Sequence, residues 1–287
     1  MALTGLQIYK LLPQTNCKEC GFPTCLAFAM KLAAKQAELA ACPYVSEEAK
    51  AQLAAAAAPP IRLVTVEGPG HKVEVGNETV LFRHEKTFYH KPGLFVRVKD
   101  TLPVGEIKAA VGEAMGYAVE YVGMNLFLDG MAVEAASGDA DTFAAAVKAV
   151  REATDRPLIL IASDPGLLKA GLAAADGVRP LLYTATAENW EEVAGLAKEA
   201  NAPVAVRADS LDELAELTEK IKAAGIQDMV LDPGVRDPAD TLVVLTQLRR
   251  LALKKNFRPL GYPIIAFPGE GASDGIEEAQ LAAQHIA

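Results

Sequence analysis

The sequence has no cysteine after residue 42, few aromatic residues and a shortage of positive charge. Its 28 lysines and arginines stand against 37 aspartates and glutamates, which gives a net charge of -9 and a pI near 5.1. A chain this acidic is repelled by phosphate backbones and by anionic lipids. The deficit therefore argues against nucleic acid or an acidic membrane surface as a partner.

Long hydrophobic runs are also missing. No stretch of about 18 uncharged apolar residues occurs, so no membrane-spanning helix is expected. The first sixteen residues, MALTGLQIYKLLPQTN, lack both a continuous apolar core and a cleavage site, which argues against a secretory signal. The expected compartment is the cytoplasm, where disulfides are rare, so clustered cysteines there indicate metal ligands.

The composition that remains is globular, with 51% hydrophobic and 23% charged residues. An alanine run followed by Pro59 and Pro60 indicates a helix end and a stiff connector. We expect three pieces: a cysteine-bearing domain over 1–57, a linker with a β-hairpin over 58–92, and a larger domain over 93–287. Within the middle piece, VEVGNETV predicts a tight hairpin turn at Gly76 and Asn77.

The larger piece alternates short β-rich runs with amphipathic helices. Ser210, with Glu213 three residues later, predicts the capping box of a helix over 210–224, and Asp164, Ala187 and Asp237 also precede helical patterns. Repeated strand–helix units indicate parallel strands joined by right-handed crossovers. The expected strands are 95–98, 119–124, 158–163, 181–186, 204–208, 229–232 and 264–267.

The fold class expected from this pattern is α/β, a small cysteine domain followed by a (β/α)₈ TIM-type barrel. Continuous apolar strands such as LILIA indicate burial on both faces, as in a barrel. Seven strand–helix units are visible, and the seventh helix is still running at Ala287, so the barrel is expected to be cut off in this chain. A doubly wound sheet stays open as an alternative, although no GxGxxG follows an early strand.

The four cysteines have the spacing C-x2-C-x4-C-x16-C, and an apolar helix is expected from Leu26 to Ala41. Three ligands from one loop and a distant fourth are typical of iron–sulfur proteins, whereas zinc sites usually present two close pairs. The positive end of the helix after Cys25 would favour a negatively charged cluster. The spacing predicts a cubane [4Fe-4S] site, while zinc and four free buried thiols stay open as alternatives.

The segment CKECGFPTCLAFAMKLA resembles the small four-cysteine cluster domain of several anaerobic electron-transfer proteins. This domain, then a barrel containing VRVKDTLP and LDPGVRDP, resembles the large (gamma) subunit of the corrinoid iron–sulfur protein of the acetyl-CoA (Wood–Ljungdahl) pathway. In that family a C-terminal corrinoid-binding domain follows the barrel, and it is absent from this sequence. The resemblance implies that Cys17, Cys20, Cys25 and Cys42 bind the cluster, and it implies no catalytic residue in this chain.

The function implied by the resemblance is that of a methyl carrier. A corrinoid (cobalamin-type) cobalt would take a methyl group from methyltetrahydrofolate through a methyltransferase and pass it to acetyl-CoA synthase. The [4Fe-4S] cluster would return Co(II) to Co(I). The implied partners are a small barrel subunit in a heterodimer, the methyltransferase, acetyl-CoA synthase/CO dehydrogenase, and a reductive activator or ferredoxin, with no nucleic acid and no membrane.

Other residues carry weaker signals. LDPG (231–234) resembles a strand end of pterin-binding barrels, so Asp232 is a candidate ligand, although Asp-Pro-Gly is also ordinary turn chemistry. FPGEG (267–271) is expected to be a plain turn because it lacks the Lys-Ser/Thr of a phosphate loop. The pairs Asp155–Arg156 and Asp232–Arg236 are expected to be solvated. His84 and His90 are expected to be structural, His71 and His285 carry no motif, and Trp190 is expected in a core or interface.

Two other functions stay open at this point. The chain could be a stand-alone pterin-dependent methyltransferase with an accessory cluster, or a zinc-stapled scaffold subunit without redox chemistry. Whether it is itself an enzyme is therefore left undecided by the sequence. The metal distinguishes the scaffold, because a zinc protein is colourless, whereas a cubane cluster is brown and becomes EPR-active when it is reduced.

Overall fold

The computed structural model describes residues 4–34, 36–57, 59–82 and 84–286. The chain divides into two compact units, Met1–Pro59 and Pro60–Ala287. The predicted boundary residue Ala58 lies outside the described residues. The segment 58–92, expected to be a linker with a hairpin, falls almost wholly within the second unit.

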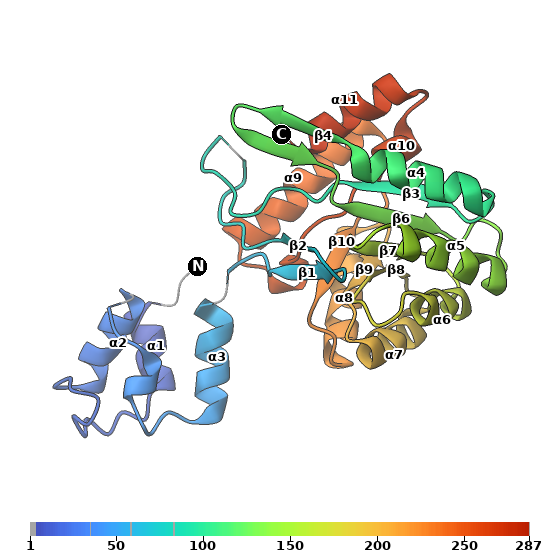
Figure 1. Cartoon of the computed structure of the whole chain (residues 1–287). Helices are drawn as coiled ribbons and strands as arrows, with labels where there is room; N and C mark the ends of the chain where they lie inside the picture. The colour runs from blue at the N-terminus through green and yellow to red at the C-terminus, as the bar shows by residue number, and fades with distance from the viewer. Residues whose placement is uncertain (1–3, 35, 58, 83, 287) are drawn as a thin grey trace. The chain divides into compact units, whose positions relative to one another are not determined.

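The first unit is built from helices around a small apolar core. Its helices are α1 (Gly5–Leu11), α2 (Cys25–Ala33), the 3₁₀ turn η1 (Leu39–Ala41) and α3 (Glu47–Ala57) (Figure 1). The helix expected over 26–41 is wrong in its second half, since α2 ends at Ala33. A continuous helix would carry Cys42 about 25 Å from Cys25 along its axis. The break instead lets both cysteines enter one hydrophobic cluster.

The second unit begins with an antiparallel hairpin of β1 (Val64–Glu67) and β2 (Lys72–Val75). Its turn spans Gly68 to His71, where the Gly68 N–H donates to the His71 carbonyl at 2.8 Å. The turn predicted at Gly76 and Asn77 is therefore wrong in place. Both residues have the positive φ that was expected (111° and 58°), but they follow β2. The Asn77 N–H donates to the Ile61 carbonyl at 3.0 Å, so this turn joins β2 to the segment before β1.

The main sheet of the second unit is parallel and has the strand order β10-β9-β8-β7-β6-β3. Helices connect successive strands and lie outside the row of strands, as the yellow and green helices show (Figure 1). This repeated arrangement confirms an α/β unit with a barrel-like parallel sheet. The strands are β3 (Phe95–Lys99), β6 (Gly130–Glu134), β7 (Leu158–Ile161), β8 (Leu181–Ala185), β9 (Val204–Arg207) and β10 (Met229–Asp232).

Two of the predicted strands do not take the expected places. The run 119–124 is not a strand of the main sheet: β4 (Ala118–Tyr121) and β5 (Met124–Phe127) form a separate antiparallel hairpin. The strand that follows β3 in the row is β6, which the sequence pattern did not reveal. The run 264–267 forms one parallel bridge, between Leu231 and Ile264. Pro263 and Pro268 flank it, and proline cannot donate to a ladder.

The helices of the second unit begin largely where the sequence indicated. Asp164, Ser210 and Asp237 cap α6, α8 and α9 by accepting backbone N–H groups, whereas α7 is preceded by Asn189 rather than Ala187. No helix in the described part of the chain is long and apolar enough to cross a membrane. The helices are α4 (Val104–Gly116), α5 (Ala140–Ala153), α6 (Pro165–Ala174), α7 (Trp190–Ala200), α8 (Leu211–Ala223), α9 (Pro238–Lys254), α10 (Pro268–Gly271) and α11 (Gly275–Ile286).

Two hydrophobic clusters hold the second unit together. The larger one lies between the strands and the surrounding helices and includes Phe143, Leu160 and Leu214. The smaller one lies on the other face of the strands and contains Val64 and Val66 of the hairpin together with Ile159 and other strand residues. The hairpin thus fills one end of the barrel interior. It lies at the amino ends of the strands, since Glu67 pairs with Arg179, directly before β8.

Candidate metal centre and barrel mouth

All four cysteines lie in the first unit, but they differ in exposure. Cys25 and Cys42 are 6% and 5% exposed and belong to the same hydrophobic cluster. Cys20 is partly buried and packs against that cluster, and Cys17 is exposed. Three of the four thiols therefore face one apolar core, and the fourth stands at its solvent edge.

The loop before α2 bends sharply around the first two cysteines. Asn16, Lys18 and Gly21 have positive φ angles of 51°, 64° and 82°. The Gly21 N–H donates to the Lys18 carbonyl at 2.9 Å, which closes a turn across Cys20. Only glycine adopts this backbone region freely, so Gly21 is the residue the turn requires.

At the start of α2, side chains of the same chain accept backbone N–H groups that the sequence analysis expected to be free. Thr24 caps the helix by accepting the Ala27 N–H at 3.1 Å, and the Asn16 side chain accepts the Cys25 N–H at 2.8 Å. Two of the free N–H groups expected at this end are thus engaged. Their effect is to fix Cys25 to the loop that carries Cys17 and Cys20.

Tyr44 links the segment after Cys42 to the three-cysteine loop. Its hydroxyl donates to Glu19 Oε1 at 2.8 Å, across 25 residues of chain. The pKa of Tyr44 is raised, first by this hydrogen bond and the charge of Glu19, then by smaller effects that include the nearby Cys17 and Cys42. Tyr44 therefore lies close to cysteines from both ends of the motif.

The donor chemistry of this region suits an iron–sulfur cluster. Among the described residues, no three His, Cys, Asp or Glu side chains lie close enough together to hold a metal ion. In such sites the bonds to the metal gather the thiolates, so the backbone and the donor types decide the fit. Four sulfur donors, one apolar core and a tight glycine turn fit a thiolate-bound cluster.

The carboxyl end of β10 carries a buried ionic group. Asp232 is 0% exposed and accepts hydrogen bonds from Tyr183 Oη (2.6 Å), the Gly234 N–H (2.8 Å) and Arg236 (3.0 and 2.9 Å). Burial raises the pKa of Asp232, but the hydrogen bonds from Arg236 and Tyr183 outweigh it and the pKa is lowered. The expectation that Asp232 and Arg236 form a solvated pair is wrong, because Tyr183 and Phe267 cover them.

The segment 267–271 completes this group instead of forming a plain turn. It contains the short helix α10, and Glu270 accepts from Arg236 at 2.5 Å and from Arg97 at 2.7 Å. Burial lowers the pKa of Arg236. The hydrogen bonds to Asp232 and Glu270 outweigh burial, so the pKa is raised overall. We call Arg97, Tyr183, Asp232, Arg236 and Glu270 the mouth network. Its charges are satisfied by one another.

The remaining sequence candidates lie in the second unit, outside the mouth network. His71 Nδ1 is 3.3 Å from Asp155, so Asp155 does not pair with Arg156, whose guanidinium lies over the Phe127 ring. His84 stacks on Phe82. Trp190 packs partly buried against the larger cluster. The two other histidines are His90, near Glu74, and His285, whose pKa is lowered by burial.

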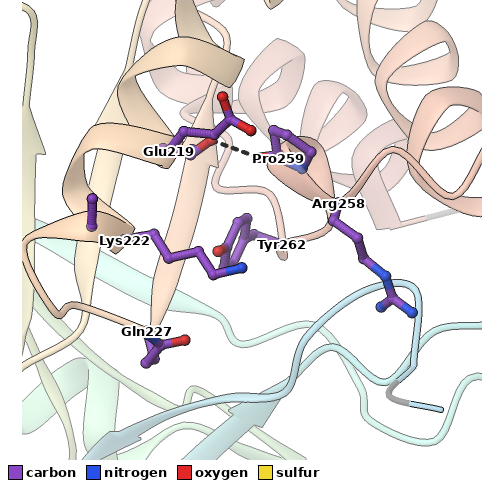
Figure 2. A pocket seen from close by; sticks show the side chains of 8 residues that line it. Glu219, Lys222, Gln227, Arg258, Pro259 and Tyr262 are labelled. Carbon is purple, nitrogen blue, oxygen red and sulfur yellow. Dashed lines mark hydrogen bonds between the residues drawn. The ribbon is translucent and has the colours of Figure 1, made fainter. Parts of the chain in front are cut away.

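A hollow of about 420 Å³ lies between the carboxyl half of α8 and the 3₁₀ turn η2 (Arg258–Leu260). Figure 2 shows Lys222 running toward Tyr262, while Arg258 points away from it. Gln227, which lines the hollow, precedes β10, so the hollow lies at the amino end of that strand. It is therefore distinct from the mouth network.

Comparison with known proteins identifies the family. The model of the "CO dehydrogenase/acetyl-CoA synthase delta subunit" family matches residues 64–282, and the chain belongs to this family. A second family model, described as "Putative Fe-S cluster", matches residues 12–44, which include all four cysteines. The N-terminal region is thus related to iron–sulfur domains.

The curated relatives carry the names that the sequence resemblance indicated. The chain is 47% identical over 286 residues to the corrinoid/iron-sulfur protein large subunit of Moorella thermoacetica, covering 100% of this chain and 64% of the relative. It is 42% identical over 273 residues to acetyl-CoA decarbonylase/synthase complex subunit gamma 2 of Methanosarcina mazei, covering 92% and 58%. The resemblance to the large subunit is confirmed. The chain spans less than two thirds of either relative.

Among solved structures, the chain overlaps dihydropteroate synthase from Xanthomonas albilineans with a TM-score of 0.46 and 16% sequence identity. The overlap covers 78% of this chain and 90% of that one. This is a distant likeness, and the description of the second unit as barrel-like rests on its own strand order.

Sequence reasoning missed several residues around the cysteines and at the mouth. Asn16, Glu19 and Tyr44 each lie within two residues of a cysteine, and that adjacency is the one signal that marked them. Tyr183 and Glu270 are far from Asp232 in the chain, and only the fold brings them together.

Proposed function

We propose that this chain is the cluster-bearing and barrel part of a subunit of a corrinoid methyl carrier in the acetyl-CoA pathway. The carrier takes a methyl group from methyltetrahydrofolate through a methyltransferase and delivers it to acetyl-CoA synthase. The support is family membership over 64–282 and 47% identity to a corrinoid/iron-sulfur large subunit along the whole chain. The barrel-like unit is taken as part of a (β/α)₈ barrel.

The single observation that carries the cluster assignment is the iron–sulfur family match over residues 12–44. The matched segment contains all four cysteines of the sequence. In this proposal Cys17, Cys20, Cys25 and Cys42 bind a [4Fe-4S] cluster, which supplies the single electron that returns Co(II) of the corrinoid to Co(I). The protein groups hold the thiolates: Asn16 and Thr24 order the start of α2.

The proposed partners follow from the same function. They are a small barrel subunit in a heterodimer, the methyltetrahydrofolate methyltransferase, acetyl-CoA synthase/CO dehydrogenase, and a reductive activator or ferredoxin. The names of the relatives, a large subunit and gamma subunits of an acetyl-CoA decarbonylase/synthase complex, support assembly with other subunits.

The mouth network favours the carrier over a stand-alone pterin methyltransferase. A ligand-binding aspartate needs free hydrogen-bonding capacity, whereas both oxygens of Asp232 are already engaged by Arg236, Tyr183 and Gly234. A ligand would have to displace Arg236, which Glu270 also holds. We therefore assign no catalytic role to Asp232.

Metal content and EPR test the cluster assignment. The chain is purified anaerobically, assayed for iron, zinc and sulfide, and reduced with dithionite. We expect four irons per chain and the EPR signal of a reduced [4Fe-4S] cluster in the unmodified chain and in Lys31→Ala, a control on the exposed side of α2. Cys20→Ala is expected to lose both. Stoichiometric zinc without iron would overturn the assignment in favour of a scaffold.

A second assay separates electron delivery from methyl transfer. Cys20→Ala is made in the complete corrinoid-containing protein and supplied with Co(I) generated by a strong chemical reductant. Methyl transfer is expected to persist, whereas recovery from Co(II) with a protein electron donor is expected to fail. Recovery that survives intact would show that the four cysteines are not the electron route.

A further inference from the structure

The hydrogen bond between Tyr44 and Glu19 joins the two separate parts of the cysteine motif. Glu19 lies between Cys17 and Cys20 in the three-cysteine loop, and Tyr44 lies two residues after Cys42. Their side chains meet at 2.8 Å, although 25 residues of chain separate them. Glu19 thus links the loop that carries Cys17 and Cys20 to the segment that follows Cys42.

The backbone is constrained at both ends of this link, although the two side chains themselves are exposed. Pro43 stands between Cys42 and Tyr44 and fixes the backbone φ there. Glu19 sits in the turn that the bond from Gly21 to Lys18 closes. The hydrogen bond thus couples the position of Cys42 to that of Cys20, because the backbone near each cysteine is held by Pro43 or by the turn.

We propose, on the basis of the proposed cluster function, that Tyr44 and Glu19 are positioning residues for the cluster. Tyr44 fastens the Cys42 segment to the three-cysteine loop, and Glu19 places one fixed negative charge beside the thiolates. Neither residue is assigned a role by the names or families of the relatives.

The charge of Glu19 has a direct electrochemical consequence. Reduction adds one electron to the cluster and one unit of negative charge to the site, with no bond formed or broken in the protein. A neighbouring carboxylate disfavours the more negative state, and net charge near a cluster is one of the factors that set its potential. Glu19 therefore lowers the reduction potential, in the direction that a donor to Co(II) requires.

Two substitutions separate the link from the charge. Tyr44→Phe removes the hydroxyl and keeps the ring and the carboxylate. Glu19→Gln removes the charge, while its amide oxygen still accepts the Tyr44 hydroxyl. Glu48→Gln, an exposed carboxylate on α3 of the same unit, controls for a general change in charge. Each anaerobically purified chain is assayed for iron release to a chelator and for midpoint potential by EPR-monitored titration.

Iron release from Tyr44→Phe is expected to be about threefold faster than from the unmodified chain, because one hydrogen bond to a charged group is lost. Glu19→Gln is expected to raise the midpoint potential and to release iron within about twofold of the unmodified rate. Glu48→Gln is expected to change neither quantity.

Equal iron release from the Tyr44→Phe and unmodified chains would overturn the fastening role of Tyr44. An unchanged potential in Glu19→Gln, or the same shift in Glu48→Gln, would overturn the electrostatic role of Glu19. These outcomes differ from failure of the proposed function, which would show as an unmodified chain without a [4Fe-4S] signal.

Discussion

Replacing Arg236 by methionine is expected to destabilise the second unit by about 3 kcal/mol. The change removes two hydrogen bonds to Asp232, at 3.0 and 2.9 Å, and leaves a fully buried carboxylate with Tyr183 and Gly234 alone. Removing one partner of a buried ion pair costs about 3–5 kcal/mol. The lower figure applies because the Arg236 side chain is 21% exposed, so water partly replaces it.

Urea titration followed by tryptophan fluorescence measures this loss. Trp190 is the one tryptophan of the sequence and packs against the larger cluster of the second unit, so its emission follows that unit. The double variant Asp232→Leu/Arg236→Met is expected to lose less than Arg236→Met, since it buries no unpaired charge. Arg250→Met, an exposed control on the same chain, is expected to stay within about 0.5 kcal/mol.

The pH dependence of stability provides an independent check on Asp232. Its pKa is lowered in the folded state by Arg236 and Tyr183, against the opposing effect of burial. A lowered folded pKa stabilises the protein above the unfolded value, about 3.9 for aspartate, and this contribution is lost as pH falls through the folded pKa. The unmodified chain is thus expected to lose stability more steeply below about pH 4 than Asp232→Asn does.

Two results together would refute the description of Asp232 as a buried, ionised and paired carboxylate. One is a change of less than about 0.5 kcal/mol in Arg236→Met, the range of an ordinary surface substitution. The other is superimposable stability curves for the unmodified chain and Asp232→Asn between neutral and acid pH.

Three further substitutions test the cap of α2 and the packing of the β1–β2 hairpin. Thr24→Ala removes the cap of α2 and is expected to speed amide hydrogen exchange in residues 25–33 about fivefold; an unchanged rate would contradict the cap. Gly76→Ala puts a Cβ against the Arg62 carbonyl at a φ of 111° and is expected to cost more than about 1 kcal/mol in urea, whereas Gly105→Ala, which has open space, is not. Val66→Ala in the buried hairpin is expected to cost about 2 kcal/mol; a loss no larger than that of exposed Val122→Ala would show that Val66 is not packed.

The sequence predicted best those strands whose pattern depends on local composition. The apolar runs that form β7, β8, β9 and β10 are continuous because both faces are buried, and the caps Asp164 and Ser210 are local hydrogen bonds. The exposed β4–β5 hairpin was mistaken for a barrel strand because β-branched and aromatic residues mark a strand and not its partner. The real strand β6 was missed because its continuous apolar run, bounded by Gly130 and Glu134, covers only residues 131–133.

The candidate sites divide in the same way. Cysteine spacing marks the candidate metal centre along the chain, and the iron–sulfur family match includes the same four residues. The state of Asp232 could not be predicted, because its burial depends on Tyr183 and Arg236 meeting under Phe267. From sequence, an Asp and an Arg four residues apart look like a surface pair.

The β1–β2 hairpin has a consequence for how the second unit folds during synthesis. Val64 and Val66 are synthesised before the rest of their hydrophobic cluster, which extends to Val230 and Ile265, about 165–200 residues later in the chain. Arg62 likewise pairs with Asp228 across 166 residues. Such distant pairings are slow to form, because the intervening chain must be ordered before they become favourable. The hairpin can bury its two valines only in part against β6, β7 and β8, and the cluster is complete once β10 has been made, so apolar surface stays exposed on the nascent chain during this interval.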